Sequence, residues 1–443
     1  MESISQTAVD IAPDQIAPVS ALERISSVDL LRGFSLLGIL LMNIVSFGLP
    51  GPAYDDPSTA GGATGWNLYI WATNYILFEG KMRAIFSMLF GAGIVIFTSR
   101  LEERGAGIRT ADLYFRRMLW LLAFGMIHAY LFWVGDILYS YAVTGLLLFA
   151  VRKAAPKYLL IAGVVILGLL IPGQVIESRE IKAMRDKAAA ADAAQKAGKQ
   201  LSDQQKEDQK KWTERLKNMK PTPERLKKEI DAHRNGYRSG FVWRAGNVHG
   251  IESWGYYSFI FFDVCGMMLI GMALLKSGYL SAQGSYATYL TVAILGYSAG
   301  IAWNSAVVYR SVHSNFDVIV ESQAQSLYQY ERLLVALAHV SLLMIISKAG
   351  LLTWVTSRIA AVGQMALTNY FMDTLVCTTI FDRMKFFGQW QRYQVYYVVA
   401  GIWIFQIIVS KIWLSRFRFG PVEWLWRSLT YWKRQPMVKE RQA

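Results

Sequence analysis

One histidine and one aspartate lie close together in a stretch that is otherwise apolar. His128 falls about 15 residues into a predicted membrane span at 113–133, and Asp136 follows eight residues later, after Gly135 and a short turn. A histidine and a carboxylate at one depth in a membrane suit a general base whose imidazole is oriented by the acid. The alternative is a buried histidine that hydrogen-bonds a backbone carbonyl, and the residues alone leave both open.

Further polar residues occur in the apolar runs, where such groups are costly and are therefore candidates for function. We predict that they converge on the outer half of the membrane and bind a substrate in a hydrated cavity that opens outward. The alternative is that they hold helices together by hydrogen bonds. The residues are Asn43, Asp263, Asn369, Tyr370 and Asp373.

Arginines mark the opposite, inner side of the predicted membrane domain. Guanidinium groups bind phosphate through paired hydrogen bonds, and the indoles of Trp424 and Trp426 could stack on an adenine. The sequence therefore predicts a surface that can hold an anionic phosphate, although arginine and tryptophan also serve as ordinary membrane anchors. The candidate arginines are Arg32, Arg116, Arg117, Arg418 and Arg427.

Motifs of soluble enzymes are missing from the sequence. It contains no P-loop, GxGxxG, HExxH or GxSxG motif and no cluster of metal ligands, so no metal site is predicted. Gly-Ala-Gly at 91–93 lies inside an apolar run, where it favours close helix packing. Cys265 and Cys377 also lie in apolar runs, without the spacing of a metal or redox site, and are expected to be small buried side chains.

The apolar runs determine the fold class. Of the 443 residues, 53% are hydrophobic and 18% are charged, against roughly 25% charged in an average soluble domain. Several runs reach about 20 residues, which is enough to cross a bilayer as a helix. This pattern excludes a soluble enzyme, a disordered protein and a disulfide scaffold. The net charge of +14 indicates basic cytoplasmic loops rather than a nucleic-acid partner.

The sequence predicts an all-α polytopic bundle of about ten spans. A further apolar segment at 66–78 has 13 residues and is expected to be interfacial or re-entrant. The spans are 28–49, 84–98, 113–133, 137–151, 158–176, 256–275, 286–309, 333–347, 359–381 and 395–414.

The distribution of Lys and Arg predicts the orientation. With both termini inside, the inner segments hold 21 of these residues and the short outer segments hold 7. Short loops that remain in the cytoplasm carry the excess of positive charge, whereas long loops cross regardless of charge. We therefore expect a multi-pass protein of the bacterial inner membrane, with both termini inside and segment 177–254 outside.

Segment 177–254 interrupts the membrane domain with charged and alanine-rich sequence. Ser202 with Gln205 is typical of a capping box, and Thr222-Pro223 of a helix start. Two or three helices are expected here, either as a plain solvated surface or with a role in substrate binding. The predicted parts are a flexible cytoplasmic N-terminus (1–27), a first membrane half (28–176), this segment, a second membrane half (255–415) and a basic aromatic cytoplasmic C-terminus (416–443).

Several segments together resemble a known family of bacterial membrane proteins. They are 28–43, 86–91, 128–136, 363–370 and 420–427, the last reading Gly420-Pro-Val-Glu-Trp-Leu-Trp-Arg427. These segments are similar to those of YeiB-like proteins, which are defined by a domain of unknown function (domain 418). The resemblance extends from about residue 28 to residue 430.

A more distant resemblance suggests a chemistry. The first span, with Arg32 followed after ten residues by Asn43, is similar to the opening span of the acyltransferase-3 proteins and of heparan-alpha-glucosaminide N-acetyltransferase. Acyltransferase-3 proteins have histidine at the position of Asn43. The glucosaminide enzyme has asparagine, with its catalytic histidine soon afterwards, whereas 48–66 here contains Asp55 and Asp56 but no histidine. The resemblance implies a cytoplasmic acyl-CoA donor near Arg32 and an acceptor near Asn43.

Three functions remain open from the sequence, and so does the question of whether the protein is an enzyme. The first is a transmembrane acyltransferase, in which His128 takes a proton from an acceptor hydroxyl or amine and Asp136 orients the imidazole. The second is a proton-coupled transporter of a small solute that uses Asp263, Asp373 and His128. The third is a non-catalytic scaffold that docks partners on 177–254. The bilayer is the expected partner in each case, and a homo-oligomer is left open.

Overall fold

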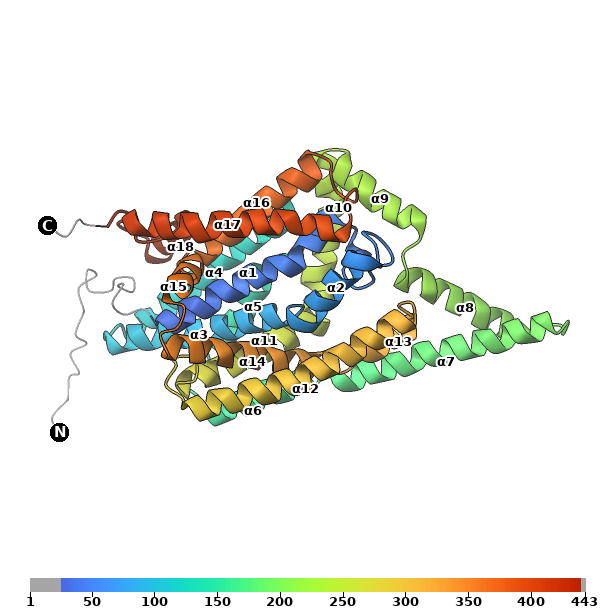
Figure 1. Cartoon of the computed structure of the whole chain (residues 1–443), viewed down its shortest axis with the longest axis horizontal. Helices are drawn as coiled ribbons and strands as arrows, with labels where there is room; N and C mark the ends of the chain where they lie inside the picture. The colour runs from blue at the N-terminus through green and yellow to red at the C-terminus, as the bar shows by residue number, and fades with distance from the viewer. Residues whose placement is uncertain (1–24, 440–443) are drawn as a thin grey trace, which may run out of the picture.

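The computed structural model describes residues 25–439, and these are almost entirely helical (Figure 1). An isolated antiparallel bridge joins Phe417 to Val438. The α-helices are α1 (Ser26–Gly48), α2 (Gly65–Leu77), α3 (Lys81–Glu103), α4 (Arg109–Leu131), α5 (Leu138–Leu148), α6 (Pro156–Gly168), α7 (Ile171–Lys196), α8 (Asp203–Met219), α9 (Pro223–Arg234), α10 (Tyr237–Gly250), α11 (Phe261–Lys276), α12 (Tyr286–His313), α13 (Val318–Gln325), α14 (Tyr328–Lys348), α15 (Thr353–Gln364), α16 (Ala366–Thr378), α17 (Arg392–Arg416) and α18 (Pro421–Tyr431). Short 3-10 or π-helical pieces are η3 (Gly51–Ala53), η4 (Ile251–Ile260) and η5 (Thr379–Arg383).

Seven helical segments of the described chain are long and apolar enough to cross a membrane, which confirms an all-α multi-pass protein. The count of ten spans is not confirmed. Three expected spans are not among the seven. The span 113–133 becomes α4, which carries Arg116 and Arg117. The span 137–151 contains the helix α5 of only 11 residues, and the span 359–381 is broken at Met365 between α15 and α16. The segment 66–78 becomes α2, which leads into α3 as one segment, Gly65–Glu103.

The helices surround α1, which lies in the middle of the bundle (Figure 1). The start of α1 and α18 lie at one end, which we call the basic end. Helices α7 and α8 project beyond the bundle at the opposite end, which we call the insertion end. Apolar side chains such as Ile161, Ile294 and Ile404 are more than half exposed on the flanks of the bundle. A lipid environment accounts for such exposure, because soluble proteins rarely show wide apolar surfaces.

Segment 177–254 contributes more helix than expected. Helix α7 begins before it, at Ile171, and α8, α9 and α10 follow, so the predicted boundary at residue 177 falls inside a helix. The capping box of Ser202 and Gln205 is confirmed, as is the N-cap of Thr222 before Pro223. Of the predicted N-terminal part, residues 1–24 lie outside the described residues, and α1 already includes Ser26 and Ser27.

Glycines allow two pairs of helices in the bundle to approach closely. Gly33 of α1 and Gly363 of α15 face each other's backbones, and Gly91 of α3 lies against the backbone of Met268 in α11. A methyl group at any of these positions would overlap a neighbouring main chain. Small residues commonly serve this purpose in membrane helices, so the expected packing role of the Gly-Ala-Gly stretch is confirmed at Gly91.

Gly91→Ala should lower the stability of the bundle by about 1–3 kcal/mol, because the added methyl forces α3 away from α11. Gly93→Ala is a matched control two residues away, since an added methyl there meets no atom within 4 Å. Thermal unfolding of the two purified variants in the same detergent measures the difference. Equal melting temperatures would contradict the assigned helix contact.

Candidate functional site

His128 and Asp136 lie together, as the sequence predicted. His128 lies in the last turn of α4. Its Nδ1 is 2.9 Å from Asp136 Oδ1. The other oxygen of Asp136 accepts a hydrogen bond of 2.9 Å from the backbone N–H of Tyr139 at the start of α5. The turn between α4 and α5 therefore fixes the carboxylate, and the carboxylate in turn orients the imidazole.

Two side chains of α16 complete this cluster. Thr374 Oγ1 lies 2.9 Å from His128 Nε2, and the Tyr370 hydroxyl donates a hydrogen bond of 3.4 Å to Asp136 Oδ1. Tyr370 and Thr374 are four residues apart, which places them on one face of the helix. His128 is fully buried, and both of its ring nitrogens are engaged. We call His128, Asp136, Tyr370 and Thr374 the central cluster.

A deep cavity leads from the basic end to this cluster. It has a volume of about 270 Å³, and Tyr370 is among its lining residues. Leu36, Leu89, Phe90 and Leu121 contribute to its apolar walls. This volume lies close to the lower end of the roughly 300–1,000 Å³ that small-molecule pockets occupy. We call it the basic-end cavity.

Arginines surround the mouth of the basic-end cavity. Three of the five predicted residues, Arg32, Arg117 and Arg427, line it, together with Arg100. The guanidinium of Arg117 lies 3.6 Å from the centre of the Trp426 ring, and Arg32 pairs with Asp29 at 2.9 Å. This combination of cations, aromatic rings and apolar walls suits a ligand with anionic groups at one end and an apolar part at the other.

Arg116 and Arg418, the other two predicted arginines, do not line this cavity. Arg116 pairs with Asp112 at 2.6 Å, one turn earlier on α4. Adjacent residues of a helix point about 100° apart, so Arg116 and Arg117 cannot both face the same cavity. Arg418 lies in the short bridge region, where its backbone N–H donates to Met437 O.

Glu423 of α18 caps the start of α16, just after the break between α15 and α16. Its Oε1 accepts hydrogen bonds of 2.6 and 3.0 Å from the backbone N–H groups of Leu367 and Thr368, at the start of α16. These N–H groups have no partners within their own helix, and a carboxylate also suits the positive end of the helix dipole. The cap fixes the start of the helix that carries Tyr370 and Thr374.

The polar residues expected to form one outward-facing cavity are divided among separate clusters. Asn369 and Asp373 lie on a different face of α16 from Tyr370, where Asp373 accepts a 2.6 Å hydrogen bond from Gln406 of α17. Asn43 is half-buried, and the described structure gives its side chain no hydrogen bond. The expected convergence is therefore wrong, because the helical repeat directs residues 369 and 373 away from residues 370 and 374.

Asp263 belongs to a buried network of charges in another part of the bundle. It accepts a hydrogen bond from Arg332 of α14 and lies 3.2 Å from Arg83 of α3. Lys81 and Glu331 are buried nearby, and Lys81 donates a 2.6 Å hydrogen bond to Asn304 of α12. We call Asp263, Arg83, Arg332, Lys81 and Glu331 the charge network. Its members join α3, α11 and α14, and Lys81 connects them to α12 through Asn304, in line with the helix-holding alternative.

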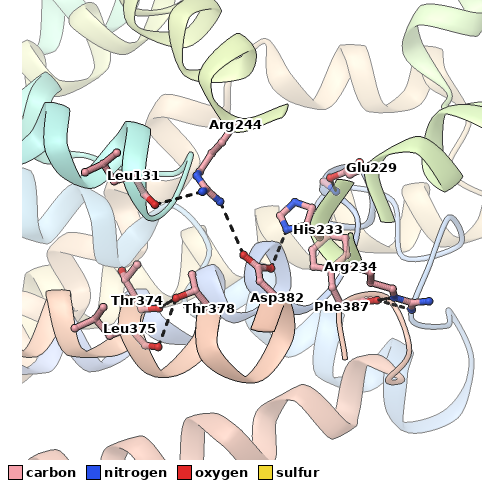
Figure 2. A network of polar contacts seen from close by, with 11 residues as sticks. Leu131, Glu229, His233, Arg234, Arg244, Thr374, Leu375, Thr378, Asp382 and Phe387 are labelled. Atoms are coloured by element: carbon pink, nitrogen blue, oxygen red, sulfur yellow. Dashed lines mark hydrogen bonds and ion pairs between the residues drawn. The ribbon is translucent and has the colours of Figure 1, made fainter. Parts of the chain in front are cut away.

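A second histidine–carboxylate pair lies at the insertion end. His233 of α9 places its Nδ1 2.8 Å from Asp382 Oδ1 in η5, and Arg244 of α10 lies 3.9 Å from the other oxygen. Figure 2 shows these three side chains converging between the insertion and the bundle. Arg244 also donates to Leu131 O at the end of α4, which satisfies a carbonyl without a helical partner.

Two further contacts attach the insertion to the bundle. Arg234 donates to Phe387 O (Figure 2), and Glu229 accepts a 2.9 Å hydrogen bond from the Gly51 N–H beyond α1. Burial raises the pKa of the Glu229 carboxyl, while the bond from Gly51 opposes this shift. Segment 177–254 is thus partly built into the site region, and α9 and α10 are not a plain solvated surface.

Comparison with known proteins identifies the family. The chain is 30% identical to the "Uncharacterized protein YeiB" of Escherichia coli (strain K12) over 424 residues, covering 95% of this chain and 99% of that protein. The chain belongs to the YeiB family. It is 29% identical over 447 residues to the "Uncharacterized protein YxaH" of Bacillus subtilis (strain 168), covering 96% and 98%. Residues 274–433 match the family described as "Protein of unknown function (DUF418)". No solved structure matches the chain.

The matched region of the YeiB family supplies one side of the central cluster. Residues 274–433 include Tyr370, Thr374 and Glu423, whereas His128 and Asp136 come from the first membrane half. Within residues 25–439, no group of three His, Cys, Asp or Glu side chains is placed to hold a metal ion.

Sequence reasoning missed four residues of this region. Thr374 had a usable signal, since it lies one helical turn after Tyr370 on the same face. Glu423 falls within the segment Gly420–Arg427 that resembles the family, but nothing local marks it as a cap. His233 and Asp382 had no signal, because 149 residues separate them.

Proposed function

We propose that this protein is an acyltransferase of the bacterial inner membrane, which passes an acyl group from cytoplasmic acyl-CoA to an acceptor hydroxyl or amine on the other side. The observation that carries the proposal is the basic-end cavity. It begins among Arg32, Arg117 and Arg427 and ends at Tyr370, which bonds to Asp136 of the central cluster. Arginines suit the phosphates of CoA, and the apolar walls suit the pantetheine and acyl chains.

Orientation follows from the same arrangement. The basic end carries the arginines of the short predicted cytoplasmic loops, and the insertion end carries segment 177–254. With basic loops retained in the cytoplasm, the cavity opens to the compartment that contains acyl-CoA. The central cluster then lies between the cytoplasmic cavity and the outer ends of α4 and α16.

The reaction at the central cluster is a general-base acyl transfer. The acceptor takes the place of Thr374 at His128 Nε2, and its oxygen or nitrogen attacks the thioester carbonyl. His128 takes the proton from the acceptor, while Asp136 holds the imidazole through Nδ1. The bond from carbon to sulfur breaks, and the departing thiolate of CoA receives that proton. No other reactant is needed.

Arg32→Ala should weaken the binding of acetyl-CoA about tenfold or more, because a hydrogen bond to a charged group contributes about 1.5–3 kcal/mol. Arg32→Lys should lose less, since it keeps the charge but not the planar fork. Arg358→Ala is the control, because Arg358 lies on α15 outside the lining of the cavity. Calorimetry on purified protein measures the affinities. Equal affinities for all four proteins would contradict the assigned phosphate site.

A proton-coupled carrier is the second candidate. It is favoured by the charge network, in which Lys81, Glu331 and Arg332 are fully buried. Ionisable groups within a membrane domain often form proton or ion pathways. In the network, however, the acids lie close to bases, and Asp263, Arg332 and Lys81 are not among the lining residues of the basic-end cavity. The basic-end cavity therefore favours the transferase.

A further inference from the structure

A polar cavity lies where segment 177–254 meets the bundle, between α7, the end of α8 and α13. It has a volume of about 460 Å³, within the roughly 300–1,000 Å³ that small-molecule pockets occupy. None of its lining residues lines the basic-end cavity or belongs to the central cluster. We call it the insertion cavity. Its charged lining residues are Asp55, Asp56, Glu177, Glu321, Lys220 and Arg225.

The four carboxylates of the insertion cavity are matched only in part by cations. Lys220 Nζ lies 3.9 Å from Asp56 Oδ2, and Glu177 pairs with Arg215 of α8 at 2.5 Å. Arg225 adds one further positive charge to the lining. Even with Arg215 included, acids outnumber bases, so the cavity keeps an excess of negative charge.

Asp55 is one of the carboxylates without a cation. Within the described part of the chain, its side chain makes no hydrogen bond and no ion pair, although it is accessible from the cavity. The pKa of its carboxyl is raised to about 7, chiefly because the surrounding protein removes the ionised form from water. The negative charges of Glu79, Glu321 and Asp56 raise this pKa as well. The ionised form of Asp55 therefore lacks a counter-charge.

Glu321 of α13 is the second such carboxylate, with no ion pair among residues 25–439. Burial raises the pKa of its carboxyl, and the charges of Asp56 and Asp317 add to this shift. The hydroxyl of Ser311 and the charge of Lys220 oppose the shift in part. Its Oε1 is buried and accepts no hydrogen bond in the described structure. Buried acceptors are costly when they are left without a donor, so this wall of the cavity calls for one.

We infer that the insertion cavity binds a small organic cation, an aliphatic amine, through Asp55 and Glu321. Ionised carboxylates only accept hydrogen bonds, and an ammonium group supplies both donors and the missing positive charge. A metal ion is disfavoured, since within residues 25–439 no group of three His, Cys, Asp or Glu side chains is placed to hold one. An anionic or neutral ligand would leave both carboxylates uncompensated. This site goes beyond the proposed function, because it does not depend on acyl transfer.

The insertion cavity also adjoins the charge network. Tyr54, which precedes Asp55, donates a 3.4 Å hydrogen bond to Glu79 Oε1, and Tyr328 of α14 donates a 2.8 Å bond to the same oxygen. Glu79 stands two residues before Lys81 of the network. A cation at Asp55 thus offsets negative charge next to these helices. Because the ligand binds the folded cavity, it should raise the melting temperature of the protein.

Calorimetry with 1,4-diaminobutane tests the site on the purified full-length protein, in an uncharged detergent at fixed ionic strength. The diamine should bind saturably, and 1,4-butanediol, its neutral counterpart, should not bind. Asp55→Asn and Glu321→Gln should each weaken the binding of the diamine about tenfold or more, the equivalent of one hydrogen bond to a charged group. Asp186→Asn is the matched control and should bind as wild type does, because Asp186 is exposed on α7 and does not line the cavity.

Equal affinities of the wild-type, Asp55→Asn and Glu321→Gln proteins for the diamine would overturn the site. Equal binding of the diol would overturn the recognition of charge, and displacement of the diamine by a lower concentration of Mg²⁺ would overturn the organic cation in favour of a metal. If Asp55→Asn does not fold, Glu321→Gln and the comparison of the two ligands on the wild-type protein still decide the matter. Diamine binding by a protein that transfers no acetyl group would support this site while the proposed function fails. Acetyl transfer without diamine binding would overturn this inference alone.

Discussion

Replacing His128 by asparagine is expected to reduce acetyl transfer from acetyl-CoA to a small alcohol by about 100-fold or more, since general bases contribute roughly 10²–10⁴-fold. Asparagine can still donate to Asp136, so the turn between α4 and α5 keeps its hydrogen bond, but it has no basic nitrogen. Binding of acetyl-CoA should be unchanged, because His128 does not line the basic-end cavity. The rate of CoA thiol release in the presence of ethylene glycol measures the loss.

Two companion variants separate catalysis from packing. Asp136→Asn should reduce turnover less than His128→Asn, because it affects the orientation of the base rather than the base itself. His339→Asn is the matched control. His339 is also buried, with Nδ1 2.7 Å from the Tyr297 hydroxyl and Nε2 2.8 Å from Leu77 O, but it lies in another part of the bundle. Full transfer activity in a stable His128→Asn protein would refute the assignment of the base.

Removal of one acid from the charge network is expected to cost far more stability than removal of a surface pair. Asp263→Ala leaves Arg332 and part of Arg83 buried without their carboxylate, and breaking a buried pair in this way typically costs about 3–5 kcal/mol. Arg332 is fully buried, whereas Asp112, which pairs with Arg116, is exposed. Asp112→Ala should therefore cost less than about 1 kcal/mol. Denaturation in a fixed detergent compares the two variants.

The double variant Asp263→Leu with Arg332→Met tests whether the lost stability comes from a buried charge left without its partner. It removes both charges and fills the space with apolar groups, so it should be more stable than Asp263→Ala. A structural network also predicts normal acetyl transfer in every variant that folds. Loss of a pH-dependent solute uptake in these variants, with stability unchanged, would instead favour the carrier.

The sequence predicts the local parts of the site well. His128 and Asp136 are eight residues apart, and a short turn is sufficient to join them, so their hydrogen bond follows from the chain itself. The caps at Ser202 and Thr222 were predictable for the same reason, since each cap depends on neighbouring residues. The sequence identified Tyr370 only as a polar residue of the second membrane half, and not as a partner of Asp136.

Long-range contacts could not be derived from the sequence. The grouping of polar residues failed on α16, because depth in a span is readable from residue number, whereas the direction of a side chain depends on which helices surround it. The break at Met365 adds to this, since α15 ends there and α16 begins as a separate helix. The pairing of His233 with Asp382 depends on how the insertion folds back onto the bundle, which no local pattern specifies. The count of ten spans is not confirmed at α5, which is apolar but has only 11 residues.

The most direct test of the proposed function is acetyl transfer by the purified protein in proteoliposomes, with acetyl-CoA as donor and ethylene glycol or ethanolamine as acceptor. Free CoA thiol and the acetylated acceptor are measured in the same samples, against liposomes without protein. We predict equal amounts of thiol and acetylated product, formed at a rate that falls about 100-fold or more in the His128→Asn protein. Intact acetyl-CoA after prolonged incubation with either acceptor, in a protein that is folded and binds acetyl-CoA, would contradict the assignment as an acyltransferase.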